Sequence, residues 1–226
     1  MTDEITIEET IKGYNEAIFD TDRDRALEVV HEALASGMTP EDIVFKVVLP
    51  AMDQMIRAIS ETLDANLAQQ YITAQIADSV VTEMIPKFKQ APHVAGHVVI
   101  GSAEGDLHSL GKRIVIGCLR ARMIEVTDLG VNVSPETFVD EALAHDASVI
   151  GISAMMAHTA RGPNGSLGVR RILKERGLED RIKIVVGGAP YRFDDELYKT
   201  VQADAWAEDG VTAGGVIARL TEGVRT

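Results

Sequence analysis

The chain has 226 residues, of which 46% are hydrophobic and 25% are charged, ordinary values for a globular protein that exclude wholesale disorder. Thirty-five acidic residues against 22 basic ones give a formal net charge of −13, which argues against partners such as nucleic acid or anionic membranes. A single cysteine, Cys118, permits no internal disulfide, so we expect a reducing, cytoplasmic setting. The sequence also shows neither a signal peptide nor an apolar run of about eighteen residues, so no membrane span is expected.

The N-terminal part of the chain has the periodicity of amphipathic helices. Apolar residues recur at steps of three and four over residues 4–19, and Thr21 is the expected N-cap of a second helix. The run Thr39-Pro40-Glu41-Asp42 predicts the start of a third helix, which Pro50 should kink or end. A fourth helix is expected over residues 67–85. Four such helices with short loops predict a small antiparallel bundle.

The period changes after residues 86–93, a segment with a proline near each end that is typical of a linker. Short β-branched runs follow, in the order His97–Ile100, Ile124–Val126, Ser148–Ile152, Lys183–Val186 and, most weakly, Ala203–Ala207. Helical patterns alternate with them, over Leu110–Arg122, Pro135–His145, Leu167–Arg176, Asp194–Val201 and Val211–Leu220. This alternation predicts a doubly wound, five-stranded parallel sheet of the Rossmann or flavodoxin type. The expected domains are a four-helix cap over residues 1–88 and an α/β domain over residues 89–226.

Ligands of such sheets bind at the carboxyl ends of the strands, so the loops that leave the strands are the candidate site. The loop after the first strand contains Asp106 and His108. This pair suits a metal site, because the histidine can give one ring nitrogen to a metal while the acid holds the other nitrogen. By itself the pair is also typical of an ordinary loop with a solvated imidazole. The glycines in these loops permit close approach of the backbone.

Three motifs in these loops carry a resemblance to a known family. Asp106-Leu107-His108-Ser109-Leu110-Gly111 matches the Asp-x-His-x-x-Gly motif of cobalamin-binding domains. Ser153-Ala154-Met155 resembles the Ser-x-Leu motif of that family, with methionine for leucine, and Gly187-Gly188 matches its Gly-Gly. Order and spacing agree as well. The whole chain therefore resembles the corrinoid proteins of methyltransferase systems, and it is similar to the cobalamin module of methionine synthase.

The resemblance implies a cobalamin that has lost its own lower base and takes His108 as the lower ligand of cobalt. It implies that Asp106 bonds to the other nitrogen of His108 and that Ser153 extends this relay. The displaced nucleotide tail would run beside the sheet, and the helical bundle would cap the upper face of the corrin. The remaining cofactor-binding positions that it implies are Ser109, Gly111, Met155, Gly187, Gly188 and Trp206. For Trp206, and for the methionines Met52, Met55 and Met84, core packing is the alternative.

The function that this resemblance implies is methyl carriage. One methyltransferase partner would load a methyl group from an amine, an ether or a betaine, and a second would pass it to a folate or a thiol. The chain would be a subunit without catalytic residues of its own, and a homodimer is compatible with its sequence. The alternatives are a cobalamin-dependent sensor or photoreceptor, a cobalamin storage protein acting through a partner, and a flavodoxin-like domain for another nucleotide.

Some segments depart from the family pattern. Residues 55–69 lack the glycines, aromatic residues and proline that usually lie between the third and fourth helices of methyl carriers. Ser109 stands for the usual acid after the histidine, and Arg113 stands for the usual asparagine. The loop over residues 159–166 is longer than is usual, and we expect it over the cofactor pocket or at a partner surface.

Overall fold

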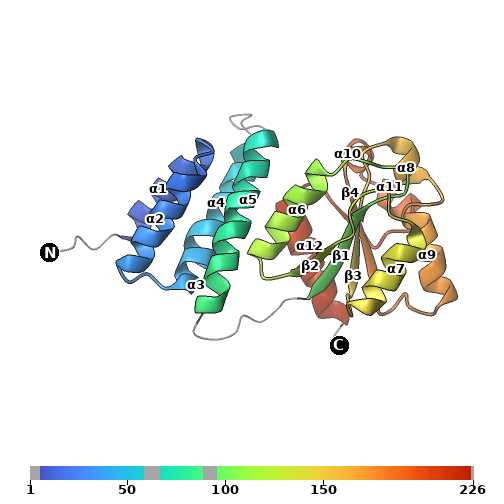
Figure 1. Cartoon of the computed structure of the whole chain (residues 1–226). Helices are drawn as coiled ribbons and strands as arrows, with labels where there is room; N and C mark the ends of the chain where they lie inside the picture. Colours follow the sequence, from blue (N-terminus) through green and yellow to red (C-terminus); the bar gives the residue numbers. More distant parts are fainter. Residues whose placement is uncertain (1–5, 59–66, 89–95, 225–226) are drawn as a thin grey trace. The chain divides into compact units, whose positions relative to one another are not determined.

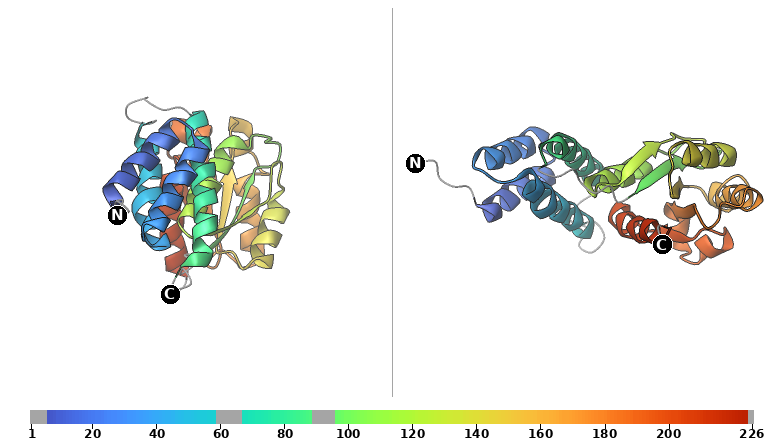
Figure 2. Two further views of the ribbon diagram at one scale, coloured as in Figure 1. Left: turned by 60° about the vertical axis from the view of Figure 1, so that its left-hand side comes forward. Right: turned by 90° about the horizontal axis from the view of Figure 1, so that it is seen from below.

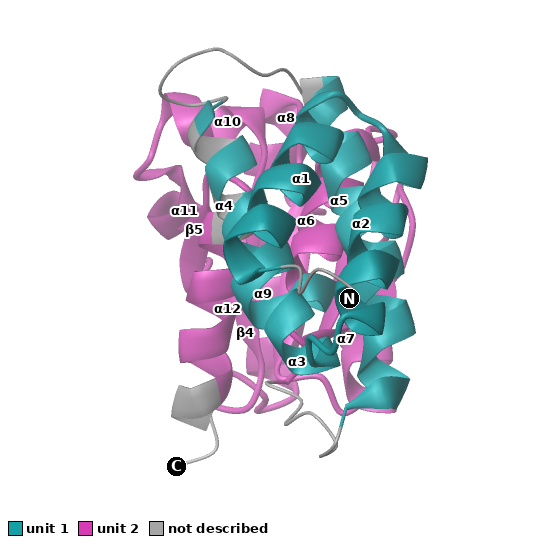
Figure 3. Ribbon diagram, turned by 90° about the vertical axis from the view of Figure 1, so that its left-hand side faces the viewer, with its two compact units in different colours: residues 1–93, 120–122 teal, residues 94–119, 123–226 magenta. Residues whose placement is uncertain are grey.

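The computed structural model describes residues 6–58, 67–88 and 96–224. The chain divides into two compact units, one formed by Met1–His93 with Arg120–Arg122 and the other by Val94–Leu119 with Met123–Thr226 (Figures 1 and 3). The predicted domain boundary after residue 88 stays a prediction, because residues 89–95 and part of the predicted linker lie outside the described residues. Within the described ranges, no helix is both long enough and apolar enough to cross a membrane.

The first unit is a bundle of four helical columns, as the sequence predicts (Figure 2). Its elements are α1 Ile7–Phe19, α2 Arg23–Ala35, α3 Pro40–Asp42, the π-helix η1 Ile43–Val48, α4 Leu49–Arg57, α5 Leu67–Met84 and the 3-10 helix η3 Ile85–Lys87. Thr6 and Glu9 form a reciprocal capping box at the start of α1, and Thr39 caps α3 as expected. Met52, Met55 and Met84 are buried, as their core alternative predicts.

The second helix begins one residue later than expected. Thr21 has φ 57°, in the left-handed region, whereas an N-cap residue needs an extended backbone. Asp22 takes that role, and its carboxylate accepts the N–H of Arg25 at 2.9 Å. The prediction of Thr21 as N-cap was therefore wrong, because Thr21 lies in the turn that ends α1.

Pro50 does not end the third helix. A proline has no N–H to donate, and its ring crowds the carbonyl four residues earlier. The turn before Pro50 is widened into the π-helix η1, in which the N–H of Leu49 reaches the carbonyl of Val44. The chain then continues as α4 through Arg57. The distortion that the sequence predicts is thus present as a wider turn and not as a break.

The second unit is a five-stranded parallel sheet covered by helices on both faces, which confirms the predicted fold (Figures 1 and 2). Its strands are β1 His97–Ser102, β2 Glu125–Asp128, β3 Val149–Ser153, β4 Lys183–Gly187 and β5 Ala205–Ala207, in the order β2-β1-β3-β4-β5. Its helices are α6 Leu110–Ala121, α7 Pro135–Ala144, α8 Ala157–Arg161, α9 Ser166–Glu175, α10 Ala189–Phe193, α11 Leu197–Thr200 and α12 Gly210–Val224.

Alternate residues of each central strand pack against opposite layers of helices. On one face, Val99 and Ile150 pack in a cluster with Phe138 of α7 and with side chains of α9 and α11. On the other face, Val98 and Val149 pack with side chains of α6 and α12. A strand that is buried on both faces must be apolar at every position, and this explains the continuous apolar runs in the sequence.

The helix predicted over Asp194–Val201 is shorter in the structure, where only α11 lies within that range, and α10 precedes it. The helix α10 ends before Asp194, which takes an extended backbone with φ −144°, and α11 begins at Leu197. An additional short helix, α8, follows β3 in the segment that the sequence suggests as a long loop. Both short helices, α8 and α10, lie at the carboxyl edge of the sheet.

One buried arginine ties α9 to the segment that precedes β5. Arg170 of α9 has a side chain only 8% exposed, and it donates to Asp204 Oδ2 at 2.6 Å and to the carbonyl of Gln202 at 2.9 Å. Asp204 also accepts the N–H of Ile184 in β4 at 2.7 Å. Removing one partner of a buried ion pair leaves an uncompensated charge.

We therefore expect Arg170→Leu to lower the free energy of unfolding of the α/β unit by about 3 kcal/mol. Urea unfolding followed by fluorescence of Trp206, the one tryptophan of the chain, measures the change in this unit. The matched control is Arg171→Leu on the same helix, whose side chain is 59% exposed in its ion pair with Glu175 and should cost less than about 1 kcal/mol. Equal losses in the two variants would contradict the prediction.

The amino end of β1 carries a histidine that is held neutral in the folded state. Burial lowers the pKa of His97 below its ordinary value of 6.5, and the neighbouring His145, whose ring centroid is 5.3 Å away, lowers it further. Glu125 and Asp146 oppose this shift without cancelling it. The unfolded chain therefore binds a proton at a higher pH than the folded chain does at this site.

We expect the α/β unit to lose stability as the pH falls below 6.5, because His97 then takes up a proton more readily in the unfolded chain. Urea midpoints of Trp206 fluorescence at about pH 7.5 and about pH 5.5 measure this loss. His97→Gln should reduce the difference between the two midpoints. An unchanged difference in that variant would show that other groups cause the pH dependence.

Candidate cofactor site

The candidate site lies where the strand order of the sheet reverses. From β1 the chain crosses to β2 on one side and then to β3 on the other, so the strand order reverses between β1 and β3, which is where parallel sheets of this type bind ligands. Ser102 ends β1 directly beside Ser153, which ends β3. The N–H of Ala103 donates to the carbonyl of Ser153 at 3.0 Å, and this bond continues the pairing into the loop that carries Asp106 and His108.

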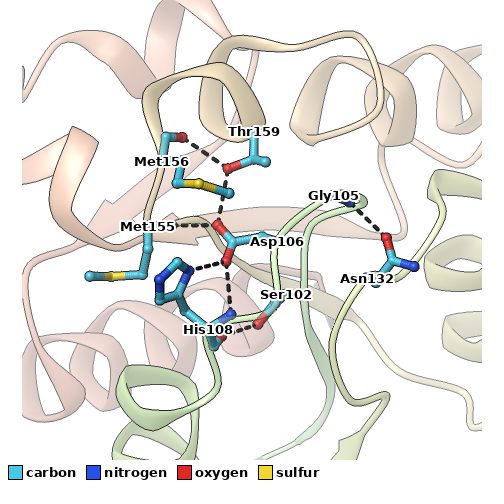
Figure 4. Close-up of polar contacts among 8 residues, drawn as sticks. All are labelled: Ser102, Gly105, Asp106, His108, Asn132, Met155, Met156 and Thr159. Carbon is cyan, nitrogen blue, oxygen red and sulfur yellow. Dashed lines mark hydrogen bonds and ion pairs between the residues drawn. The ribbon is translucent and has the colours of Figure 1, made fainter.

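The centre of the site is a fully buried carboxylate. Asp106 is 0% exposed, and each of its oxygens accepts two hydrogen bonds (Figure 4). Oδ1 accepts the backbone N–H of His108 at 3.0 Å and pairs with its ring Nδ1 at 2.8 Å. Oδ2 accepts the N–H of Met155 at 2.7 Å and the hydroxyl of Thr159 at 3.0 Å. Four donors from three segments of the chain thus compensate the charge.

These donors keep Asp106 ionised. Burial by itself raises the pKa of the carboxyl group, but the hydrogen bonds from His108, Met155 and Thr159 outweigh it and hold the pKa below the ordinary value of 3.8. A carboxylate can only accept hydrogen bonds, so the proton in the contact with His108 must lie on Nδ1. In the neutral imidazole, the lone pair that can bind a metal then lies on Nε2.

His108 presents that second nitrogen away from the core, since its side chain is 55% exposed. Within the described ranges, no three histidine, cysteine or acidic side chains gather in a way that could hold a metal ion. His108 therefore offers a single ligand. One protein ligand is what a metal needs when a macrocycle already supplies its other ligands, so the donor set fits a corrinoid.

The loops that carry His108 and Met155 also hold large hydrophobic side chains with exposed surface. Leu107 is 73% exposed, Leu110 is 41% exposed and Met155 is 42% exposed. A Cβ placed on Gly111 would meet nothing within 4 Å, so the start of α6 leaves open space. These features fit a bulky, largely apolar group lying against the edge of the sheet.

A threonine hydroxyl contacts Asp106 in addition to the residues that the sequence suggests. Among the described residues, no hydrogen bond joins the Ser153 side chain to Asp106 or His108, and the hydroxyl of Thr159 in α8 takes that place. The same hydroxyl lies 2.9 Å from the carbonyl of Met156. The role of Ser153 in the relay and at the cofactor stays a prediction, and Thr159 is a further contact of Asp106. The sequence does not indicate this contact, because Thr159 lies on the short helix α8, which no hydrophobic pattern predicts.

The other predicted site residues are spread along the same edge. Ser109 and Gly111 lie at the start of α6, and Gly187 pairs in register with Ser153. Gly188 has φ 117°, and a Cβ there would come within 2.0 Å of the carbonyl oxygen of Ala154, so backbone packing alone requires glycine. Trp206 packs against the core on the face covered by α7 and α9, as its packing alternative predicts. Its contact with the nucleotide tail stays a prediction.

A second anchor of the site was not predicted either. Lys112 in the first turn of α6 is 2% exposed and forms an ion pair with Asp128, the last residue of β2. Asp128 also accepts the N–H of Gly130 at 2.8 Å. The pair fastens the start of α6, and with it the end of the histidine loop, to the neighbouring strand. Lys112 and Asp128 lie in different elements of the chain, and no sequence pattern around either residue indicates that the two form an ion pair.

Comparison with known proteins assigns the chain to a family. The profile of the B12 binding domain matches residues 96–214, and a second profile of the same description matches residues 10–62. The first match covers the sheet and the site loops, and the second falls in the helical unit. The cofactor is therefore a cobalamin, and the alternative of a flavodoxin-like domain for another nucleotide is excluded.

Relatives of similar length cover both units. The chain is 34% identical over 190 residues to a trimethylamine corrinoid protein of Methanosarcina barkeri, with 83% of this chain and 86% of that protein covered. It is 31% identical over 210 residues to a dimethylamine corrinoid protein of the same organism, with 91% and 94% covered. The fold matches the methanol:cobalamin methyltransferase complex of Methanosarcina barkeri with a TM-score of 0.74 and 24% identity, covering 97% of this chain and 82% of that one. The chain thus belongs to the cobalamin-binding corrinoid proteins of methyltransferase systems.

Proposed function

We propose that the chain carries a methyl group on the cobalt of a cobalamin whose lower ligand is His108, in the base-off/His-on state. The observation that carries this proposal is the pairing of Nδ1 of His108 with the buried carboxylate of Asp106 at 2.8 Å. This contact leaves Nε2 as the free nitrogen of an exposed imidazole. A cofactor that brought its own lower base would need no such residue.

The relatives support the class of methyl donor and of partner. The relative at 34% identity is a trimethylamine corrinoid protein, and the one at 31% identity is a dimethylamine corrinoid protein. Both alignments cover more than four fifths of this chain and of the relative. We therefore propose a methylated amine as the methyl source and methyltransferase proteins as the partners. In this proposal the chain is a carrier subunit, and the methyltransferases supply the substrate pockets. The single cysteine of the chain, Cys118, is buried and cannot form an internal disulfide, which is compatible with the reducing cytoplasm in which we place this role.

The residues of this chain have separate tasks in the proposal. When bound, the cobalt supplies the chemistry by taking up a methyl group and giving it away again. His108 binds the metal and Asp106 holds the proton on Nδ1, so that the basicity of the ligand follows the state of a buried acid. The N–H of Met155 and the hydroxyl of Thr159 fix that acid in turn. The exposed apolar side chains beside them exclude water from the lower face.

We propose that the helical unit also takes part in cobalamin binding. The support is the second match to a B12 binding domain, over residues 10–62, which falls within this unit. Residues 59–66, which include most of the segment that departs from the family pattern, lie outside the described residues.

The first prediction of this proposal concerns the ligand. After reconstitution with hydroxocobalamin and with methylcobalamin, we expect His108→Ala to shift the absorption spectrum of the bound cofactor or to lose the cofactor during gel filtration. The matched control is His158→Ala, since His158 is an exposed histidine of the same unit and should leave spectrum and retention unchanged. Identical spectra and retention for wild type and His108→Ala would overturn the ligand assignment.

Methyl carriage needs a separate readout. The loaded and reduced chain is mixed with isotopically labelled trimethylamine or dimethylamine and a corrinoid-dependent methylamine methyltransferase. We expect label to elute with this chain in gel filtration, and no label on the chain when cobalamin is left out. Retention of cobalamin without uptake of label from either amine would refute these donors while leaving cofactor binding intact.

The relay gives a further expectation. Thr159 is 4% exposed, and Thr159→Val keeps its shape but removes one of the two donors to Oδ2 of Asp106. The loss of this hydrogen bond to the buried carboxylate of Asp106 should lower the free energy of unfolding by about 1–3 kcal/mol, as measured by urea unfolding followed by Trp206 fluorescence. Thr159→Ser keeps the hydroxyl and should cost clearly less. A loss in Thr159→Ser as large as in Thr159→Val would mean that the methyl group, and not the hydroxyl, is what matters.

A further inference from the structure

The loop that carries Asp106 and His108 is held from outside by Asn132, a residue between β2 and α7. Oδ1 of Asn132 accepts the N–H of Gly105 at 2.8 Å (Figure 4). The backbone N–H of Asn132 donates to the carbonyl of Asp106 at 3.0 Å. The two bonds bracket the Gly105–Asp106 dipeptide. They fix the backbone from which the Asp106 side chain reaches the histidine.

The backbone around this contact selects the two residue types. Asn132 has φ 56° and Gly105 has φ 82°, and both values lie in the left-handed region. Asparagine is among the few residues with a side chain that adopt this conformation readily, and glycine adopts it without strain. Next to the contact, Ala103 and Val133 form a parallel bridge, and the N–H of Val133 donates to the carbonyl of Ser102 at 3.0 Å. Asn132 therefore acts from a segment that is itself anchored to the sheet.

The other end of the loop is fastened as well. The hydroxyl of Ser102, a residue that is 0% exposed, donates to the carbonyl of His108 at 2.7 Å. His108 itself is more than half exposed, so core packing cannot hold its ring in place. Its position must come from hydrogen bonds to its own loop and to Asp106. A loop closed at both ends by such bonds keeps a metal ligand ready before the metal arrives.

We propose that Asn132 is a positioning residue for the histidine ligand of the cofactor. It touches neither the metal nor the corrin in this assignment, and it acts by holding Gly105 and Asp106 so that the carboxylate meets Nδ1 of His108. The inference rests on the proposed function for the role of His108 as ligand. The two hydrogen bonds of Asn132 are present in the protein without its cofactor, so their effect can be measured in the cofactor-free chain.

Three variants of the full chain separate the side-chain contact from backbone effects. Asn132→Gly keeps the left-handed backbone and removes the acceptor, while Asn132→Asp keeps an acceptor of the same size. Asn132 is exposed, so neither change creates a cavity. The control is Gln202→Gly, because Gln202 is also exposed, has φ 57° and accepts a hydrogen bond through its side-chain amide, from Lys174 at 3.0 Å. Gln202 lies before β5, away from the site loops.

Two measurements apply to each variant. Amide hydrogen exchange of Gly105 and His108 in the chain without cofactor should become about fivefold faster in Asn132→Gly, the effect of losing one ordinary hydrogen bond. Titration with hydroxocobalamin should show a dissociation constant about fivefold higher and a smaller fraction with the spectrum that depends on His108. Asn132→Asp and Gln202→Gly should stay close to wild type in both measurements.

Several results would overturn the inference. They are unchanged exchange in Asn132→Gly, faster exchange without any change in the cobalamin spectrum, an equal loss in Asn132→Asp, and an equal loss in Gln202→Gly. Failure of the proposed function looks different. In that case the wild-type cobalamin spectrum would not depend on His108. The exchange rates of the cofactor-free chain would then still show whether Asn132 holds the loop.

Discussion

A buried carboxylate is the constraint on which the rest of this structure depends. Asp106 has no exposed surface, and an ionised group in that position is tolerated only when its oxygens are fully supplied with donors. The donors come from its own loop, from the backbone after β3 and from α8. The fold must therefore hold two loops and the helix α8 together to within hydrogen-bond distance. The same four bonds leave the proton on Nδ1 of His108 and its other nitrogen free.

The parallel sheet meets this constraint through its edge. The two-sided apolar core makes the strands rigid, and their carboxyl ends present loops at the point where the strand order reverses. Two further contacts hold these loops in place. They are the ion pair of Lys112 with Asp128 and the hydrogen bond from the N–H of Gly105 to Asn132. Stability is thus supplied by the strands and helices, while the placement of His108 is decided by a few polar contacts at the carboxyl edge of the sheet.

This division fits a protein whose chemistry belongs to its cofactor. A corrinoid brings its own ring of ligands, so the protein needs to add one nitrogen in the right tautomer and an apolar surface beside it. Among the described residues the site offers that and no second metal ligand. In the proposed function, methyltransferase partners must reach the cofactor, and a histidine at an exposed edge of the sheet is compatible with that role.

The sequence by itself determined the elements and the motifs, because both are local. Buried strands such as β3 must be apolar at every position, and the Asp106–His108 pair lies within one loop, so each is visible in consecutive residues. Pro50 likewise predicted a distortion of its helix, although only the structure showed it as a wider turn. Tertiary structure alone decided that Thr159 completes the relay and that Asn132 holds the loop. These contacts join residues 53 and 27 positions apart, and hydropathy records burial but not which distant polar groups meet.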